Sequence, residues 1–125
     1  MERPHYHGHR KRLRERFLKS GFAGFAEHEV VELLLTLAIP RADVKPPAKA
    51  LLGRFGSLRG VLDTPLSELR SVAGVGEVAA IALHVIRESA TLYLQEMSEE
   101  AEVLHDPKRL ADLPRRSAFR GITYG

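Results

Sequence analysis

Residues 69–81 read Leu-Arg-Ser-Val-Ala-Gly-Val-Gly-Glu-Val-Ala-Ala-Ile, and this stretch decides the fold. An apolar helix leads into the turn Gly74-Val75-Gly76, and a second helix carries the small residue Ala80 four positions after the last glycine. This spacing is typical of a helix-hairpin-helix, a motif that holds nucleic-acid backbone without reading bases. The small side chain of Ala80 predicts close packing between the two helices.

The chemistry of the motif depends on its glycines. Gly74 can take a positive φ for a tight turn, and Gly76 has no Cβ to obstruct a phosphate. The free amide N–H groups at the start of the next helix, at its positive dipole end, favour an anion. We therefore expect Gly74, Val75 and Gly76 to present backbone amides to one phosphate. The alternative is a plain interhelical turn, which Glu77 favours because its carboxylate competes with phosphate for the helix start.

Length and composition limit the classes of protein. A chain of 125 residues is long enough for one helical domain with tails and too short for two full domains. The absence of cysteine excludes disulfides and thiolate chemistry. There is no apolar leader and no apolar run of membrane-spanning length, so we expect a cytoplasmic protein without membrane contact.

The positive charge is concentrated in the first half of the chain. Residues 1–60 hold twelve Lys or Arg against six Asp or Glu, whereas residues 61–125 hold seven against ten. A basic helix is predicted from His9 to about Lys19. A charged run is often only a solvated face, but like charges four residues apart repel each other, and a polyanion would relieve that cost. We expect the electrostatic contacts from Arg10, Arg12, Arg14 and Arg16.

The remaining pattern is helical throughout, and no segment alternates as a strand would. An almost wholly apolar helix is predicted over Glu27–Ile39. The next helix has Asp43 as its cap and two prolines in its first turn, and the following helices begin after Gly56-Ser57 and at the cap Thr64. A long helix runs from Glu77 into residues 93–97. The sequence therefore predicts an all-α fold of five to six helices.

An internal repeat refines this architecture. A shift of 32 residues places Leu37 on Leu69, Ala48 on Ala80 and Leu51 on Leu83. The pattern predicts a paired helix-hairpin-helix bundle of the SAM/RuvA-C-like type over residues 1–97, followed by a partly disordered tail, residues 98–125, with a short helix near residues 107–113. The first hairpin lacks the glycines and offers cations instead, of which we select Arg41 and Lys45 as a flanking patch.

Two groups of side chains suggest other chemistry. His5, His7 and His9 are potential zinc ligands, but they lie in an arm without a supporting carboxylate shell, so we predict no metal site. Three glutamates, Glu27, Glu29 and Glu32, begin an apolar helix, where dipole complementarity and a solvated face explain them better than a paired acid site. No combination of catalytic residue types stands in a recognisable motif. We predict no enzymatic activity and no cofactor.

Three ordered motifs resemble one bacterial family. They are Tyr6-His7-Gly8-His9-Arg10-x-Arg12-Leu13-Arg14-x-Arg16-Phe17, Ile39-Pro40-Arg41-x-Asp43-Val44-Lys45-Pro46 and Arg54-Phe55-Gly56-Ser57-Leu58. Over about residues 5–95 the chain resembles the N-terminal part of the RadC-like (UPF0758) proteins, traditionally assigned to DNA repair. The resemblance implies a helix-hairpin-helix-type domain followed by an MPN-like metalloprotease-type domain with a His-x-His-Pro zinc motif. That motif is not in this sequence, so we expect the N-terminal domain alone, without peptidase activity.

Two functions of different classes stay open, and so does the oligomeric state. The first is binding of DNA backbone without sequence specificity, selective at most for nicked, branched or single-stranded forms. The second is a protein-interaction scaffold without DNA contact, which Glu77 and the acidic second half favour. A remnant with reduced function is a third interpretation.

Overall fold

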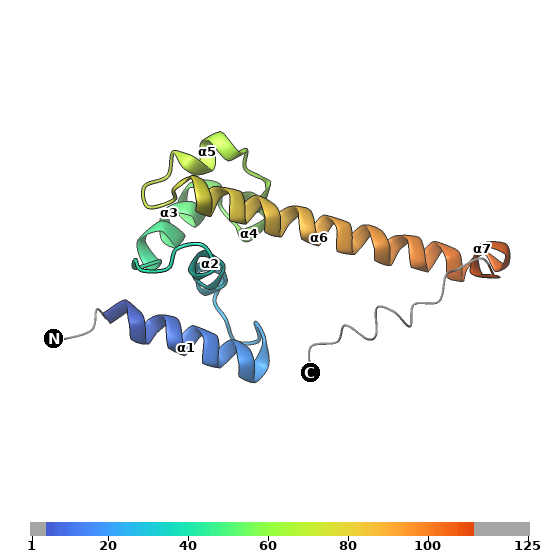
Figure 1. Cartoon of the computed structure of the whole chain (residues 1–125), viewed down its shortest axis with the longest axis horizontal. Helices are drawn as coiled ribbons and strands as arrows, with labels where there is room; N and C mark the ends of the chain where they lie inside the picture. The colour runs from blue at the N-terminus through green and yellow to red at the C-terminus, as the bar shows by residue number, and fades with distance from the viewer. Residues whose placement is uncertain (1–4, 112–125) are drawn as a thin grey trace. The chain divides into compact units, whose positions relative to one another are not determined.

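The computed structural model of the chain describes residues 5–111, and within them every regular element is an α-helix (Figure 1). The all-α prediction is therefore confirmed. The helices number seven in this range, one more than the upper expectation: α1 (His5–Ser20), α2 (Glu27–Thr36), α3 (Lys45–Phe55), α4 (Leu58–Asp63), α5 (Leu66–Arg70), α6 (Glu77–Leu104) and α7 (Pro107–Ala111). None of the helices in residues 5–111 is both long and apolar enough to cross a membrane.

The chain forms two compact units that divide between Glu88 and Ser89. The first contains α1 to α5 and the beginning of α6, and the second contains the rest of α6 and α7. The sequence predicted a tail from residue 98, but α6 continues as regular helix to Leu104. Residues 112–125 of the expected tail lie outside the described residues.

One apolar core holds the first unit together. It is built by α2 to α6 from Val31, Leu35, Val44, Ala48, Leu51, Val61, Leu69, Val72, Val75, Ala79, Ala80 and Leu83. Ala80 is fully buried, as its place after the glycine turn predicted. Removing this apolar surface from water is the main favourable contribution to folding of the unit.

The expected repeat is visible where each second helix begins. α3 starts at Lys45 and α6 at Glu77, which are 32 residues apart. The equivalent pairs Ala48/Ala80 and Leu51/Leu83 are all buried. The helices before the two turns agree less well, because Leu69 is buried whereas Leu37 is 73% exposed. The pairing of two complete hairpins therefore stays a prediction.

Local capping differs from expectation at two places. The Asp43 carboxylate accepts a hydrogen bond from the Lys45 N–H (3.0 Å), although Val44 occupies the N-cap position. Thr64 does not cap α5, because Pro65 stands at the N-cap and the Thr64 hydroxyl donates to the Gly60 carbonyl (2.6 Å). Thr64 is buried, so its hydroxyl satisfies an acceptor inside the fold instead of a helix end.

Candidate nucleic-acid interface

The glycine turn joins α5 to α6 and rests against the start of α3. Gly74 has φ +85°, the left-handed conformation that the sequence predicted. A Cβ at Gly74 would lie 3.2 Å from the Pro47 Cβ, so close packing requires glycine here as well. This contact brings the turn beside the first turn of α3, which begins at Lys45.

The amides without a helical acceptor begin at Gly76, two positions after the first of the three amides that the sequence predicted. The Val75 N–H donates to the Val72 carbonyl (3.0 Å) and the Val75 side chain is buried, so Val75 cannot present its amide to a phosphate. The first helical bond of α6 runs from the Ala80 N–H to the Gly76 carbonyl (3.0 Å). The N–H groups from Gly76 to Ala79 precede that bond and have no helical acceptor, and Gly76, Glu77 and Val78 are the exposed residues among them.

Space is also open at this helix start. A Cβ built on Gly76 meets no atom within 4 Å. Gly76 is therefore not required for packing or for a positive φ, in contrast to Gly74. The exposed backbone, the missing side chain and the positive end of the 28-residue helix α6 together form a surface suited to an anion.

The start of α3 is built in the opposite way. Asp43 accepts the Lys45 N–H, and Pro46 and Pro47 have no N–H. The next amide, that of Ala48, bonds to the Val44 carbonyl (3.1 Å). No amide in the first turn of α3 is left for a ligand.

Two arginines near the glycine turn were missed by the sequence interpretation. Arg70 contacts the Glu77 carboxylate (3.8 Å), and both side chains are largely exposed. Arg54 donates from Nη1 to the hydroxyl of Ser71 (2.9 Å), which precedes the turn. Arg70 was visible inside the stretch of residues 69–81. Arg54 reaches the turn only because α3 folds against it, which sequence spacing does not indicate.

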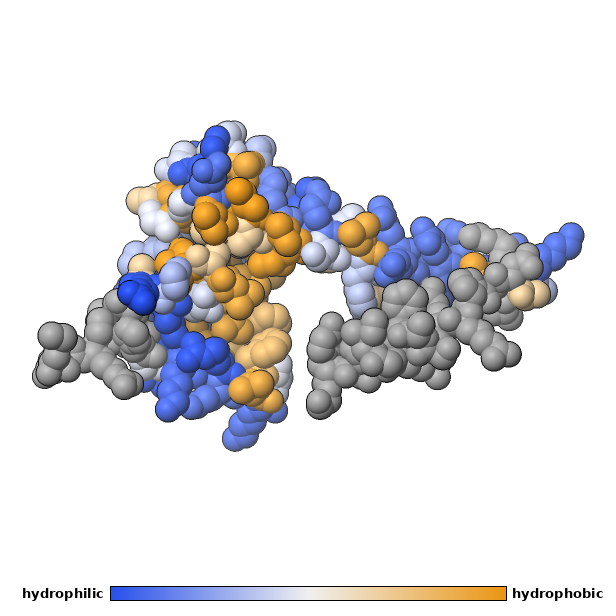
Figure 2. Space-filling view, in the orientation of Figure 1, coloured by the Kyte–Doolittle hydropathy of each residue, from blue (hydrophilic) through white to orange (hydrophobic). Residues whose placement is uncertain are grey.

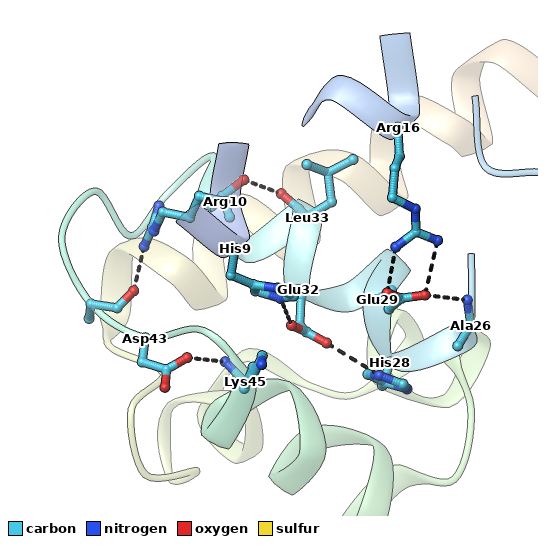
Figure 3. Close-up of polar contacts among 12 residues, drawn as sticks. His9, Arg10, Arg16, Ala26, His28, Glu29, Glu32, Leu33, Asp43 and Lys45 are labelled. Carbon is cyan, nitrogen blue, oxygen red and sulfur yellow. Dashed lines mark hydrogen bonds and ion pairs between the residues drawn. The ribbon is translucent and has the colours of Figure 1, made fainter. Parts of the chain in front are cut away.

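The basic helix α1 uses two of its four selected arginines to hold the fold. Arg10 is buried and donates to the Ala42 carbonyl (2.6 Å) (Figure 3). Arg16 donates to Glu29 (2.6 Å) and to the Gly24 carbonyl (3.1 Å), and its guanidinium lies 4.5 Å from the Phe25 ring centroid. These contacts give both arginines partners within the first unit, and their part in phosphate binding stays a prediction.

The other selected cations remain at the surface. Arg12, Arg14 and Arg41 are exposed, whereas Lys45 is half-buried. The Ala42 carbonyl that receives Arg10 lies next to Arg41, so the start of α1 is fixed against the loop that carries this side chain. Of the predicted patch, Lys45 lies two residues before Pro47, which packs on the glycine turn.

The ion pair between Arg16 and Glu29 perturbs both groups. The hydrogen bond from Arg16, reinforced by the Ala26 N–H, lowers the pKa of Glu29 from 4.5 to about 2. The same pair raises the pKa of Arg16. Glu29 also accepts the Ala26 N–H (2.9 Å) three residues before it, which is half of a capping box at the start of α2 (Figure 3).

Glu32 corrects the prediction that the glutamates of α2 form a solvated face. Its side chain is only 1% exposed and accepts from His9 Nε2, while His28 Nε2 lies 3.6 Å from its other oxygen. Glu27 accepts the Leu58 N–H (2.9 Å) and so joins α2 to α4. Within the described part of the chain no cluster of three His, Cys, Asp or Glu could hold a metal ion. The side chains of the remaining histidines of the N-terminal motif, at positions 5 and 7, lie outside the described residues.

The fold and the turn define a small all-α domain in which a glycine turn exposes the start of a long helix. The sequence profile of the UPF0758 N-terminal domain matches residues 7–81. A UPF0758 protein of Fusobacterium nucleatum is 42% identical over 94 residues, which are 74% of this chain and 40% of that protein. The chain belongs to the UPF0758 family, and it spans less than half the length of that relative. No solved structure gives a significant match to the chain.

Proposed function

We propose that this domain binds the phosphate backbone of DNA without base readout, with the amides of Gly76, Glu77 and Val78 holding one phosphate. The observation that supports it best is the open start of α6, where a Cβ on Gly76 would meet nothing and the first helical bond begins only at Ala80. The exposed side chains of Arg54 and Arg70 supply nearby positive charge.

Glu77 weakens this site without closing it. Its carboxylate sits in the first turn of α6 and pairs with Arg70 at 3.8 Å. An exposed pair of this kind contributes little stability, so a phosphate can replace Glu77 as the partner of Arg70 at small cost. We infer modest affinity that falls steeply with salt, because phosphate contacts release counterions.

The test measures binding to labelled duplex, nicked, branched and single-stranded DNA at low and at physiological salt. The critical variant is Gly76→Asp. An aspartate at the N-cap satisfies the free amides of α6 and preserves the helix, while its charge repels phosphate. We expect at least about a tenfold loss of affinity with unchanged thermal stability, of the order that one lost charge-assisted contact causes.

Ser98→Asp is the matched control, because it adds the same charge at an exposed position of α6 in the second unit. We expect that variant to bind like the unmodified chain. Equal losses in both variants would show a general charge effect, and no loss in Gly76→Asp would exclude the helix start as the site.

The competing function is a protein-interaction scaffold, and an apolar groove between α1 and α2 favours it. The dependence of affinity on salt distinguishes the two functions, since the affinity of an apolar interface changes little with ionic strength. We propose no catalytic step for this chain under either function.

A further inference from the structure

The first unit carries an apolar groove that no element of that unit fills. It has a volume of about 360 Å³ and is lined by Arg14, Phe17 and Leu18 of α1, by Phe22, and by Leu33, Leu34 and Leu37 of α2. Leu18 is 84% exposed and Leu37 73% exposed, so large side chains at the groove face water. Figure 2 shows the apolar side chains of this region gathered beside the hydrophilic surface of α1. A contiguous patch of this kind marks an interaction surface.

The second unit carries a helix face of matching character. Ala90, Tyr93, Leu94 and Met97 of α6 occupy positions i, i+3, i+4 and i+7, which lie on one side of a helix. The stripe continues to Leu104, and Tyr93 and Leu94 are 65% and 63% exposed. This is the anchor pattern of a helix that lies in an apolar groove. We call these residues the α6 stripe.

Charge makes the two surfaces complementary. From Glu88 to Pro107 the chain contains no Lys or Arg, and its acidic residues include Glu96 and Glu100 beside the α6 stripe. The groove has the exposed cation Arg14 in its lining. An acidic helix with an apolar stripe therefore fits an apolar groove whose charged lining residue is an arginine.

We propose that the chain self-associates, with the α6 stripe of one copy lying in the α1–α2 groove of a second copy. A second copy is the occupant because the same chain supplies both the groove and a helix whose apolar pattern and charge fit it. In a closed dimer with twofold symmetry this contact forms twice. The proposal is independent of DNA binding, because it uses neither the glycine turn nor the start of α6.

Sedimentation velocity of the full chain over a wide concentration range tests the association. Leu18→Ser with Leu37→Ser alters the groove, and Tyr93→Ser with Met97→Ser alters the stripe. All four side chains are more than half exposed, so the fold should persist in both variants. We expect each variant to raise the dimer dissociation constant at least about tenfold. Val85→Ser with Leu92→Ser is the matched control, because these exposed apolar residues of α6 lie seven positions apart on the side of the helix away from the stripe.

A charge exchange tests the partner more strictly. Arg14→Glu alone and Glu96→Lys with Glu100→Lys alone should each weaken association, and an equimolar mixture of the two variants should restore it. A paramagnetic label tests directly which residues of the two copies lie close together. The chain has no cysteine, so Ser98→Cys can be labelled uniquely and mixed with an isotope-labelled, unmodified copy. We expect broadening of the Leu33, Leu34 and Leu37 signals.

Three results would overturn the proposal. The first is a monomer at every concentration. The second is association weakened by the stripe variant but not by the groove variant, which would indicate pairing of the two α6 helices. The third is paramagnetic broadening confined to α6 of the isotope-labelled copy. Each leaves the DNA measurements with Gly76→Asp unaffected, so the two proposals fail separately.

Discussion

The starts of α3 and α6 occupy equivalent positions in the repeat but differ in the hydrogen bonding of their backbone amides. In α3 an aspartate and two prolines leave no amide of the first turn without a partner. In α6 a glycine turn leaves the amides of Gly76, Glu77 and Val78 ahead of the first helical bond. The comparison shows that one architecture can support a purely structural helix start or one that is open to a ligand. The difference depends on a few residues in the turn.

Gly74→Val should have the largest effect on stability, because valine disfavours the backbone conformation on which the open start of α6 depends. A β-branched residue at φ +85° is strained, and its Cβ would lie 3.2 Å from the Pro47 Cβ. We expect the free energy of unfolding to fall by about 3 kcal/mol in urea denaturation. Gly53→Ala, in the open interior of α3, should instead raise it by about 0.5–1 kcal/mol. An unchanged unfolding midpoint in Gly74→Val would contradict this account of the turn.

Val78→Pro converts the open helix start toward the closed one. Position 78 is the repeat equivalent of Pro46, and the Val78 side chain is 68% exposed. Proline removes one amide there but is tolerated in the first turn of a helix. We expect DNA affinity to fall several-fold in a fluorescence anisotropy titration, with the helix content unchanged by circular dichroism. Val85→Ser, later in the same helix, should bind normally, and normal binding by Val78→Pro would show that the Val78 amide is not used.

The pH dependence of stability extends the comparison to α2, the helix that precedes the closed start of α3. Glu29 of α2 has its pKa lowered from 4.5 to about 2 by Arg16 and the Ala26 N–H. Its ionised form therefore stabilises the folded state fully above about pH 4.5, and this contribution is lost as the pH falls toward 2. Glu29→Gln should lower the melting temperature at pH 7 and flatten its dependence on pH between 4.5 and 2. Identical pH profiles for the variant and the unmodified chain would exclude this role.

Asp43→Ala should have the smallest effect, because it removes the capping hydrogen bond to the Lys45 N–H at the start of α3. The Lys45 N–H loses its acceptor, and we expect the free energy of unfolding to fall by about 1 kcal/mol. Affinity for DNA should not fall, since the closed start of α3 does not contribute to the proposed site. A loss of DNA binding without a loss of stability would assign Asp43 a functional part instead.

The sequence predicted the fold well because its signals are local. Alternating glycines, first-turn prolines and apolar periodicity fixed the all-α class, the positive φ of Gly74 and the burial of Ala80. The length of α6 was underestimated, although Pro107 lies three residues after Leu104, where a proline commonly follows the end of a helix. The net charge of a helix does not show which of its cationic side chains form contacts within the protein.

The candidate site was predicted less well because its contacts join distant segments. Arg10 and Arg16 appeared available as part of a cationic run, but their partners lie in loops and helices that fold against α1. Glu32 appeared solvated, although His9 and the packing of α1 on α2 bury it. The displacement of the free amides past Val75 depends on one backbone hydrogen bond within the turn, which residue types do not specify.

The most direct test of the central claim is a nuclear magnetic resonance titration of the isotope-labelled chain with a short DNA duplex. We predict that the amide signals of Gly76, Glu77 and Val78 shift progressively with DNA, while those of Lys45 and Ala48 in the closed start stay in place. Binding that shifts other signals but leaves these three amide signals at the start of α6 unmoved would contradict the account.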